Sequence, residues 1–184
     1  MVTTATLKQR LANTRRKGLT LVETAMVLGI LAIVVGGIML YYTNANTNRQ
    51  TTAALGDLAA IQQAVRNLYG GQASYQGIAA RDLIDTNALP SRMVAGTTLR
   101  HSFNGVINIG PGDAGAGQGS GFRVEFTNVP AEACSRMLST DLGRGLYSAG
   151  ASTTRTQATG LPFTPGQAAA SCSQTNNTIT WVFN

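Results

Sequence analysis

The sequence has little of the chemistry from which metal centres and active sites are built. Its 184 residues include one histidine and two cysteines, Cys134 and Cys172, which stand too far apart for a C-x-x-C pair. Metal sites need clusters of such ligands, so we predict neither a metal nor a cofactor. Serine, aspartate and histidine are present, but nothing in their spacing marks a catalytic set, and we expect no enzyme.

Charged residues are also scarce, and most of the excess positive charge lies at the N-terminal end. The net charge of +6 would suit a nucleic-acid partner, but residues 1–18 hold five cations, both lysines among them, and no acid. From Leu19 onward nine arginines face eight acids. The basic character therefore belongs to a leader, and we identify no nucleic-acid site.

Two isolated features resemble functional motifs but predict ordinary structure. Residues 110–115 (GPGDAG) match G-x-G-x-x-G, yet more glycines follow, up to Gly121, where a nucleotide site needs a helix. A hairpin loop is the expected structure. His101 follows Arg100, has no evident acid or nucleophile partner, and is expected to be a surface or capping residue.

What the sequence does have is one long apolar run. Residues 19–42 (LTLVETAMVLGILAIVVGGIMLYY) carry Glu23 as their only charge. About 20 apolar residues, rising about 1.5 Å each, cross a hydrocarbon core of about 30 Å. The basic cluster before the run favours a cytoplasmic N terminus, and Tyr41 and Tyr42 suit the opposite interface. We therefore predict one membrane span, with the rest of the chain outside the cytoplasm.

Two simpler interpretations compete with a specialised span. A secretory signal peptide would account for the charge pattern and for a small-x-small site at residues 43–45, but its apolar core usually has about 7 to 15 residues. A plain single-pass anchor accounts for the length but not for Glu23. A carboxylate within a span costs on the order of 3 kcal/mol at the centre, and less near the interface, so it usually marks a function.

The residues around Glu23 resemble a known processing site. RRKG at 15–18 followed by LTLVE at 19–23 is similar to the prepilin peptidase site of type IV pilins. The resemblance implies cleavage between Gly18 and Leu19, and N-methylation of Leu19. Most of the family, including type II secretion pseudopilins, has Phe where this chain has Leu19. Leucine and the 18-residue leader are more like the type IVb branch.

Two further segments of the sequence extend this resemblance. TAMVL at 24–28 and LYGGQASYQG at 68–77 are similar to bundle-forming pilins and to the thin-pilus pilins of conjugative plasmids. The resemblance implies the type IV pilin fold and a filament made of copies of this chain. It also implies three assembly partners: the prepilin peptidase, an inner-membrane platform protein and a cytoplasmic assembly ATPase.

Cleavage would leave an amine on Leu19 and a carboxylate on Glu23, both in apolar surroundings. Each charge is costly alone, so pairing the amine of one subunit with Glu23 of its neighbour would fix the axial register. Pairing within one helix, four residues apart, is the alternative.

The same helix has a stripe of small residues. At about 100° per residue, four of them lie within about 60° and permit close helix packing: Ala25, Gly29, Ala32 and Gly36. Beyond Tyr42 the helical pattern continues in more polar form and ends near Tyr69, before Gly70 and Gly71. Its apolar positions are Leu55, Leu58, Ile61, Val65 and Leu68.

The remaining residues predict a globular head of α+β class, in which an antiparallel sheet packs on the long helix. We expect helices near 78–87 and 131–142, and strands at 103–109, 122–127 and 179–183, with a stretch rich in small residues before the last strand. Outside the cytoplasm a Cys134–Cys172 disulfide would persist, two unrelated buried thiols being the alternative. By resemblance, residues 134–172 form an exposed region that contacts other subunits and adheres.

The expected function is that of a major structural subunit of a type IVb-like pilus. The protein would lie in the bacterial inner membrane before assembly and in the extracellular pilus afterwards. The expected segments are a leader (1–18), the membrane and filament-core half of the helix (19–42), its amphipathic half (43–70) and the head (71–184). A minor pilin, a type II secretion pseudopilin or a non-polymerising single-pass binding protein are the alternatives.

Overall fold

The computed structural model describes residues 20–151, 156–157 and 160–184. They fall into two compact units, one ending at Asn44 and the other running from Ala45 to Asn184. The elements of secondary structure are α1 (Leu21–Tyr69), α2 (Ala80–Asp85), η1 (Ser91–Met93), β1 (Val94–Ala95), β2 (Thr98–Arg100), β3 (Val106–Asp113), β4 (Gln118–Pro130), α3 (Ala131–Ser139), β5 (Leu146–Ala151), β6 (Thr156–Gln157), α4 (Pro165–Ser171) and β7 (Asn176–Phe183).

Helix α1 has 49 residues and ends where the sequence predicts. At its start, the hydroxyl of Thr20 accepts a hydrogen bond from the Glu23 amide at 3.2 Å, which satisfies one of the free donors of the first turn. At its end, a side chain at Gly70 would overlap the carbonyl oxygen of Arg66, so glycine fits there without strain.

The part of α1 that follows Ala45 has one buried face. Leu58, Ile61 and Val65 are buried as predicted, while Leu55 and Leu68 are half-buried at the margin of that face. The buried residues of the helix are Thr51, Ala54, Asp57, Leu58, Ile61, Ala64 and Val65.

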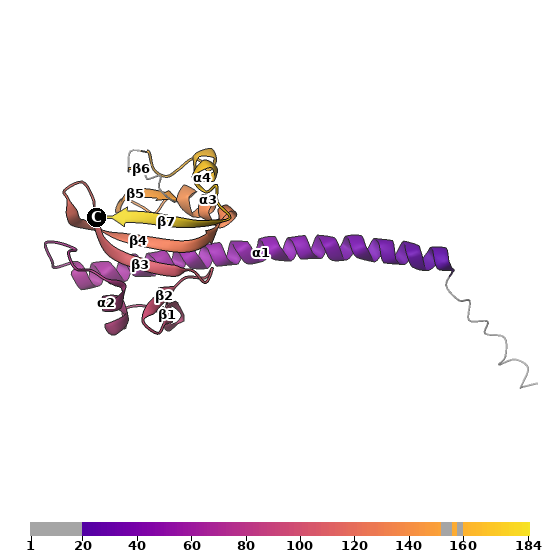
Figure 1. The fold of residues 1–184 in the computed structure, drawn as a ribbon, viewed down its shortest axis with the longest axis horizontal. Helices are drawn as coiled ribbons and strands as arrows, with labels where there is room; N and C mark the ends of the chain where they lie inside the picture. Colours follow the sequence, from indigo (N-terminus) through magenta and orange to yellow (C-terminus); the bar gives the residue numbers. More distant parts are fainter. Residues whose placement is uncertain (1–19, 152–155, 158–159) are drawn as a thin grey trace, which may run out of the picture. The chain divides into compact units, whose positions relative to one another are not determined.

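The seven strands form one antiparallel sheet in the order β1-β2-β3-β4-β7-β5-β6 (Figure 1). Strand β7 therefore lies between β4 and β5, although both precede it in the chain. The alternation predicted for these strands becomes cross-strand pairing of apolar residues. The pairs are Phe122 with Phe183, Val124 with Trp181 and Phe126 with Ile179.

These pairs and the buried face of α1 form the core of the head. Phe126 meets Trp181 edge-on with ring centroids 5.3 Å apart, and Phe122 stacks on Phe183 at the same separation. All four rings are fully buried in one cluster with the apolar residues of α1. Burying each ring contributes on the order of 2–3 kcal/mol, so this cluster is the main support of the α+β fold.

The hairpin predicted at the glycine-rich segment is confirmed, but its strands are longer than expected. Strand β3 begins at Val106 rather than Phe103, because residues 101–104 form a turn in which Asn104 has a positive φ of 66°. It then continues through Asp113 and pairs with β4. The Asp113 carboxylate accepts hydrogen bonds from the amides of Gly115 and Gly117, which closes the turn.

The stretch rich in small residues is more regular than predicted. It contains strand β5 and helix α4, and the preceding helix α3 stops at Ser139 rather than 142. Helix α4 has a reciprocal cap, in which the amides of Thr164 and Gln167 each donate to the other's side chain, and Pro165 occupies its first turn. Residues 164–167 (TPGQ) match the capping-box pattern with proline in the first turn, so the sequence does contain a signal for α4.

Candidate assembly interface

The predicted cleavage residues, Gly18 and Leu19, lie outside the described residues. Glu23 is described, and it stands in the first turn of α1 with its side chain exposed. Within the described parts of the chain its carboxylate forms no ion pair. The dipole of the helix favours an acid at this end, but an exposed carboxylate without a cation still needs one when the surroundings become apolar.

The apolar residues around Glu23 are exposed along the whole segment from Leu21 to Tyr42. The large ones have exposed fractions between 49% at Val27 and 84% at Leu21. Among the described residues, α1 is the one helix whose length and composition would let it cross a membrane, and none of its most apolar stretch is buried. Such a surface is stable only against lipid or other apolar helices.

The small-residue stripe lies on this exposed segment. Ala25 and Ala32 are exposed, and a side chain added at Gly29 or Gly36 would meet no atom within 4 Å. The stripe is therefore not used for packing within the part of the chain that the structure describes. Small side chains permit close approach of a second helix, and this is the surface on which it could occur.

The predicted disulfide is confirmed. Cys134 of α3 and Cys172, just after α4, are bonded, with Cα atoms 5.9 Å apart and both side chains buried. Helix α3 also packs against α4. The bond thus fixes both ends of the 134–172 region to one place on the head.

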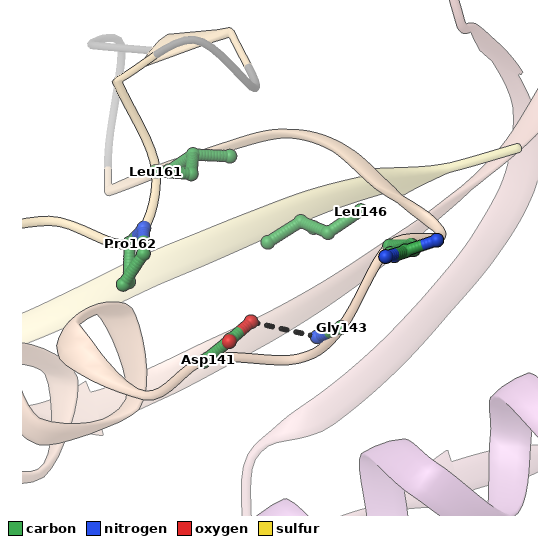
Figure 2. A pocket seen from close by; sticks show the side chains of 6 residues that line it. Asp141, Gly143, Leu146, Leu161 and Pro162 are labelled. Atoms are coloured by element: carbon green, nitrogen blue, oxygen red, sulfur yellow. Dashed lines mark hydrogen bonds between the residues drawn. The ribbon is translucent and has the colours of Figure 1, made fainter.

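A pocket of about 320 Å³ opens within this disulfide-bounded region (Figure 2). Asp141 accepts a hydrogen bond from the Gly143 amide at 2.9 Å, and this turn forms one wall. Leu161 and Pro162 approach from the segment before α4. The lining combines two opposite charges with aliphatic side chains: Asp141, Gly143, Arg144, Leu146, Leu161 and Pro162.

A buried carboxylate on α1, which the sequence did not reveal, positions the β1–β2 side of the head. Asp57 is only 2% exposed. Its Oδ1 is 2.5 Å from the Arg92 guanidinium of η1, and its Oδ2 accepts a hydrogen bond from the Ser102 hydroxyl at 3.2 Å. One residue of the helix therefore holds two separate segments. The available signal was its place four residues before buried Ile61, on the same helix face.

The expectation of a surface position for His101 is wrong. Its side chain is 4% exposed and stacks on Phe126, with ring centroids 4.7 Å apart and planes 3° from parallel. Burial lowers the pKa of His101, an effect that the Thr127 carbonyl and the charge of Asp57 partly oppose. Sequence neighbours gave no indication of this, because the ring is covered by strand β4, more than twenty residues further along.

A long helix packed on an antiparallel sheet, with a disulfide-bounded region beside it, defines the type IV pilin fold. Two solved structures share it. The type IVb pilin from Salmonella typhi matches with a TM-score of 0.59 and 19% identity, over 71% of this chain and 97% of that one. TcpA, a type IV pilin from Vibrio cholerae El Tor biotype, matches with a TM-score of 0.52 and 11% identity, over 74% and 99%.

Within this class, the chain belongs to the bundlin family, whose model matches residues 43–183. Two relatives are each named the major structural subunit of bundle-forming pilus, one from Escherichia coli O111:H- and one from E. coli O127:H6 strain E2348/69. Both are 29% identical to this chain over 176 residues, which cover 88% of it and 90% of each relative.

Proposed function

We propose that this chain is the major structural subunit of a type IVb-like pilus and polymerises through α1. The observation that carries the proposal is an exposed, membrane-length apolar segment in a chain of the bundlin family. The curated relatives, which match over most of their length, are named major structural subunits of a pilus. The role is structural rather than catalytic.

Processing comes first in this proposal. Prepilin peptidase removes residues 1–18 after Gly18, and the new amino terminus on Leu19 is methylated. Residues 19–42 then form the membrane and filament-core half of the helix, 43–70 its amphipathic half and 71–184 the head. The basic leader supports an N terminus on the cytoplasmic side of the inner membrane before assembly.

Assembly then transfers the apolar segment from lipid to the filament core. The amine of Leu19 in one subunit pairs with Glu23 of its neighbour, which compensates both charges only when the subunits are in register. The small-residue stripe packs against adjoining helices. An inner-membrane platform protein and an assembly ATPase drive the transfer, and the product is an extracellular pilus.

The exposed surface of that pilus includes the disulfide-bounded region. Its polar surface and its pocket, with Asp141 and Arg144 at one wall, are suited to contacts that form and break in water. Adhesion and contacts between neighbouring heads are assigned to this region.

The test is to replace Glu23 in cells that carry the assembly system. We expect Glu23→Gln to be cleaved and methylated normally, as mass spectrometry of the mature N terminus reports, but the yield of sheared filaments to fall by about tenfold or more. Asp85→Asn is the matched control, because it removes an exposed acid from the head. An unchanged yield would contradict the pairing of Glu23. An intact leader on the wild-type protein would contradict the whole processing scheme and favour a single-pass binding protein.

Abundance separates the major subunit from a minor pilin or a pseudopilin. The proposal expects this chain to dominate the protein content of purified filaments, whereas a trace amount would assign it to the minor class.

A further inference from the structure

The surroundings of His101 fix which of its ring nitrogens carries the proton. Nε2 lies 2.8 Å from the carbonyl oxygen of Thr127, which can only accept, so Nε2 must donate. Nδ1 faces the amide of Phe103 at 3.3 Å, which can only donate, so Nδ1 must accept. Both contacts are satisfied by one neutral form, the Nε2–H tautomer.

The ring holds the turn between β2 and β3 closed. Within that turn the His101 amide donates to the carbonyl of Gly105 at 3.2 Å, and the Asn104 amide donates to the carbonyl of His101 at 2.8 Å. A side chain at Gly105 would overlap both Thr127 and the ring, so the turn closes directly over the imidazole. Residues 101–105 are called the latch below.

The latch is attached to two elements far apart in the chain. Through its ring it is bound to β4, where it stacks on Phe126 and donates to Thr127. Through Ser102 it is bound to Asp57 of α1. Release of the latch would therefore detach the turn between β2 and β3 from β4 and α1, while β2 keeps its pairing with β3.

The charged groups packed around the ring come from three elements. Asp57 lies on α1, and its charge is balanced by Arg92 of η1. Arg100, at the end of β2, donates to the carbonyl of Asn104 at 2.9 Å and so spans the latch from outside. On the β4 side the immediate contacts of the ring are Phe126 and Thr127, which do not titrate. Asp57 is thus the one acid in these contacts that favours a protonated ring.

A second proton would have to bind at Nδ1. It would turn Nδ1 into a donor that faces the N–H donor of Phe103, so the hydrogen bond between them would be lost. Burial already lowers the pKa of His101 below its ordinary value of 6.5. Because the pKa of His101 is lower in the folded chain than in the unfolded chain, the neutral ring contributes its full stabilisation above pH 6.5. This stabilisation is lost as the pH falls through the folded pKa, because the unfolded chain takes up the proton more readily.

We propose that residues 101–105 form an acid-sensitive latch, in which uptake of a proton at Nδ1 of His101 expels the ring from β4 and opens the turn between β2 and β3. The proton comes from solvent and forms the N–H bond at Nδ1, which is the only covalent change, and the hydrogen bonds of the ring with Phe103 and Thr127 are lost. The latch is built from contacts within the single subunit and does not rest on the proposed function.

Hydrogen exchange on the unassembled, detergent-solubilised full chain tests this. After correction for the intrinsic rate, we expect exchange in peptides covering 98–107 to rise by about tenfold or more between about pH 7.5 and about pH 5. Peptides from β4 and β7 should keep their protection. A flat profile in 98–107 would overturn the proposal.

His101→Phe is the first variant, because it keeps an aromatic ring against Phe126 and cannot take up a proton. Its exchange in 98–107 should be independent of pH over this range. An acid response equal to that of the wild type would overturn the proposal, since it would assign the response to Asp57. His101→Gln, which keeps a donor for Thr127, serves as a second variant if the first folds poorly.

Imidazole ¹⁵N spectra of the wild type need no variant. We expect the Nε2–H tautomer at neutral pH, and protonation of Nδ1 at the same pH at which the amides of the latch lose protection. A ring that takes up the proton while the amides of Phe103 and Asn104 stay protected would overturn the proposal.

Discussion

The guanidinium of Arg92 lies 2.5 Å from Oδ1 of Asp57, and only one of the two partners is buried: Asp57 is 2% exposed, whereas the Arg92 side chain is 61% exposed. Water can take over as partner of the arginine if Asp57 is removed. If Arg92 is removed, the buried carboxylate loses its partner cation. The two residues are therefore unequal in what their loss should cost.

Arg92→Ala should lower the free energy of unfolding by about 2 kcal/mol or more, because it leaves a buried carboxylate with only the Ser102 hydroxyl as partner. Adding Asp57→Asn should recover much of this loss. Urea denaturation of the solubilised chain measures both values. Arg81→Ala, in the exposed Arg81–Asp85 pair, is the control and should change stability by less than about 0.5 kcal/mol. Equal costs at the two arginines would show that burial of Asp57 is of no consequence.

Replacement of both Cys134 and Cys172 by alanine should destabilise the head by about 4 kcal/mol, because the bond closes a loop with a sequence separation of 38 residues. The loss should be seen as a lower urea midpoint and as faster proteolysis of the 134–172 region. Ser173→Ala, next to Cys172 and exposed, should behave as wild type. Unchanged protease resistance in the double variant would mean that α3 and α4 hold this region without the bond.

Gly105→Ala should destabilise the head by about 2 kcal/mol or more, since the new methyl group would overlap Thr127 and His101. Gly56→Ala is its counterpart, because nothing lies within 4 Å of the added atom on α1. That change should be neutral or stabilise the unassembled subunit by up to about 1 kcal/mol, as expected for glycine within a helix. Thermal unfolding of both variants separates the two cases, and similar midpoints would contradict the close packing over the latch.

Gly36→Leu should reduce filament yield by about tenfold or more while leaving the stability of the unassembled head unchanged, because it fills the stripe on which a second helix is proposed to pack. Gly37→Leu is a close control, since it is the same substitution one residue later and about 100° around the helix. Both positions are open in the single chain. Equal filament yields would show that the stripe is not a packing surface.

The parts of the fold that the sequence predicts are those with a local period. The long helix and the alternation of β4 and β7 follow from residue spacing, and the structure confirms them. The disulfide, also confirmed, was predicted from the expected compartment instead. Two buried polar residues were not predictable in the same way. Asp57 was not recognised as a buried acid, and His101 was expected to be a surface or capping residue. Their partners come from η1 and β4, which local spacing does not reveal. The spacing of apolar residues indicates which face of an element is buried. A polar group is stable on that face only when tertiary contacts supply its hydrogen-bond or ionic partners.

Strand β5 escaped prediction for a related reason. Its residues, LYSAGA at 146–151, include few of the branched and aromatic side chains that usually mark a strand. Pairing with β7 overrides this weak preference, because β7 lies inside the sheet and most of its residues are buried. The residues of the candidate interface were evident from the local sequence. Contacts of Glu23 and of the small-residue stripe with other subunits depend on neighbouring chains, which a single sequence does not contain.

The position of β7 has a consequence for how the head is made. Strands β1–β4 and strands β5–β6 are joined into one sheet only by the strand that comes after all of them. Until residues 176–183 have emerged, the growing polypeptide would hold two half-sheets, each with a bare edge open to unwanted partners. Completion of the subunit is thus a single late event, so a molecule cut short before this strand should be cleared by proteases and should not enter a fibre as a defective building block.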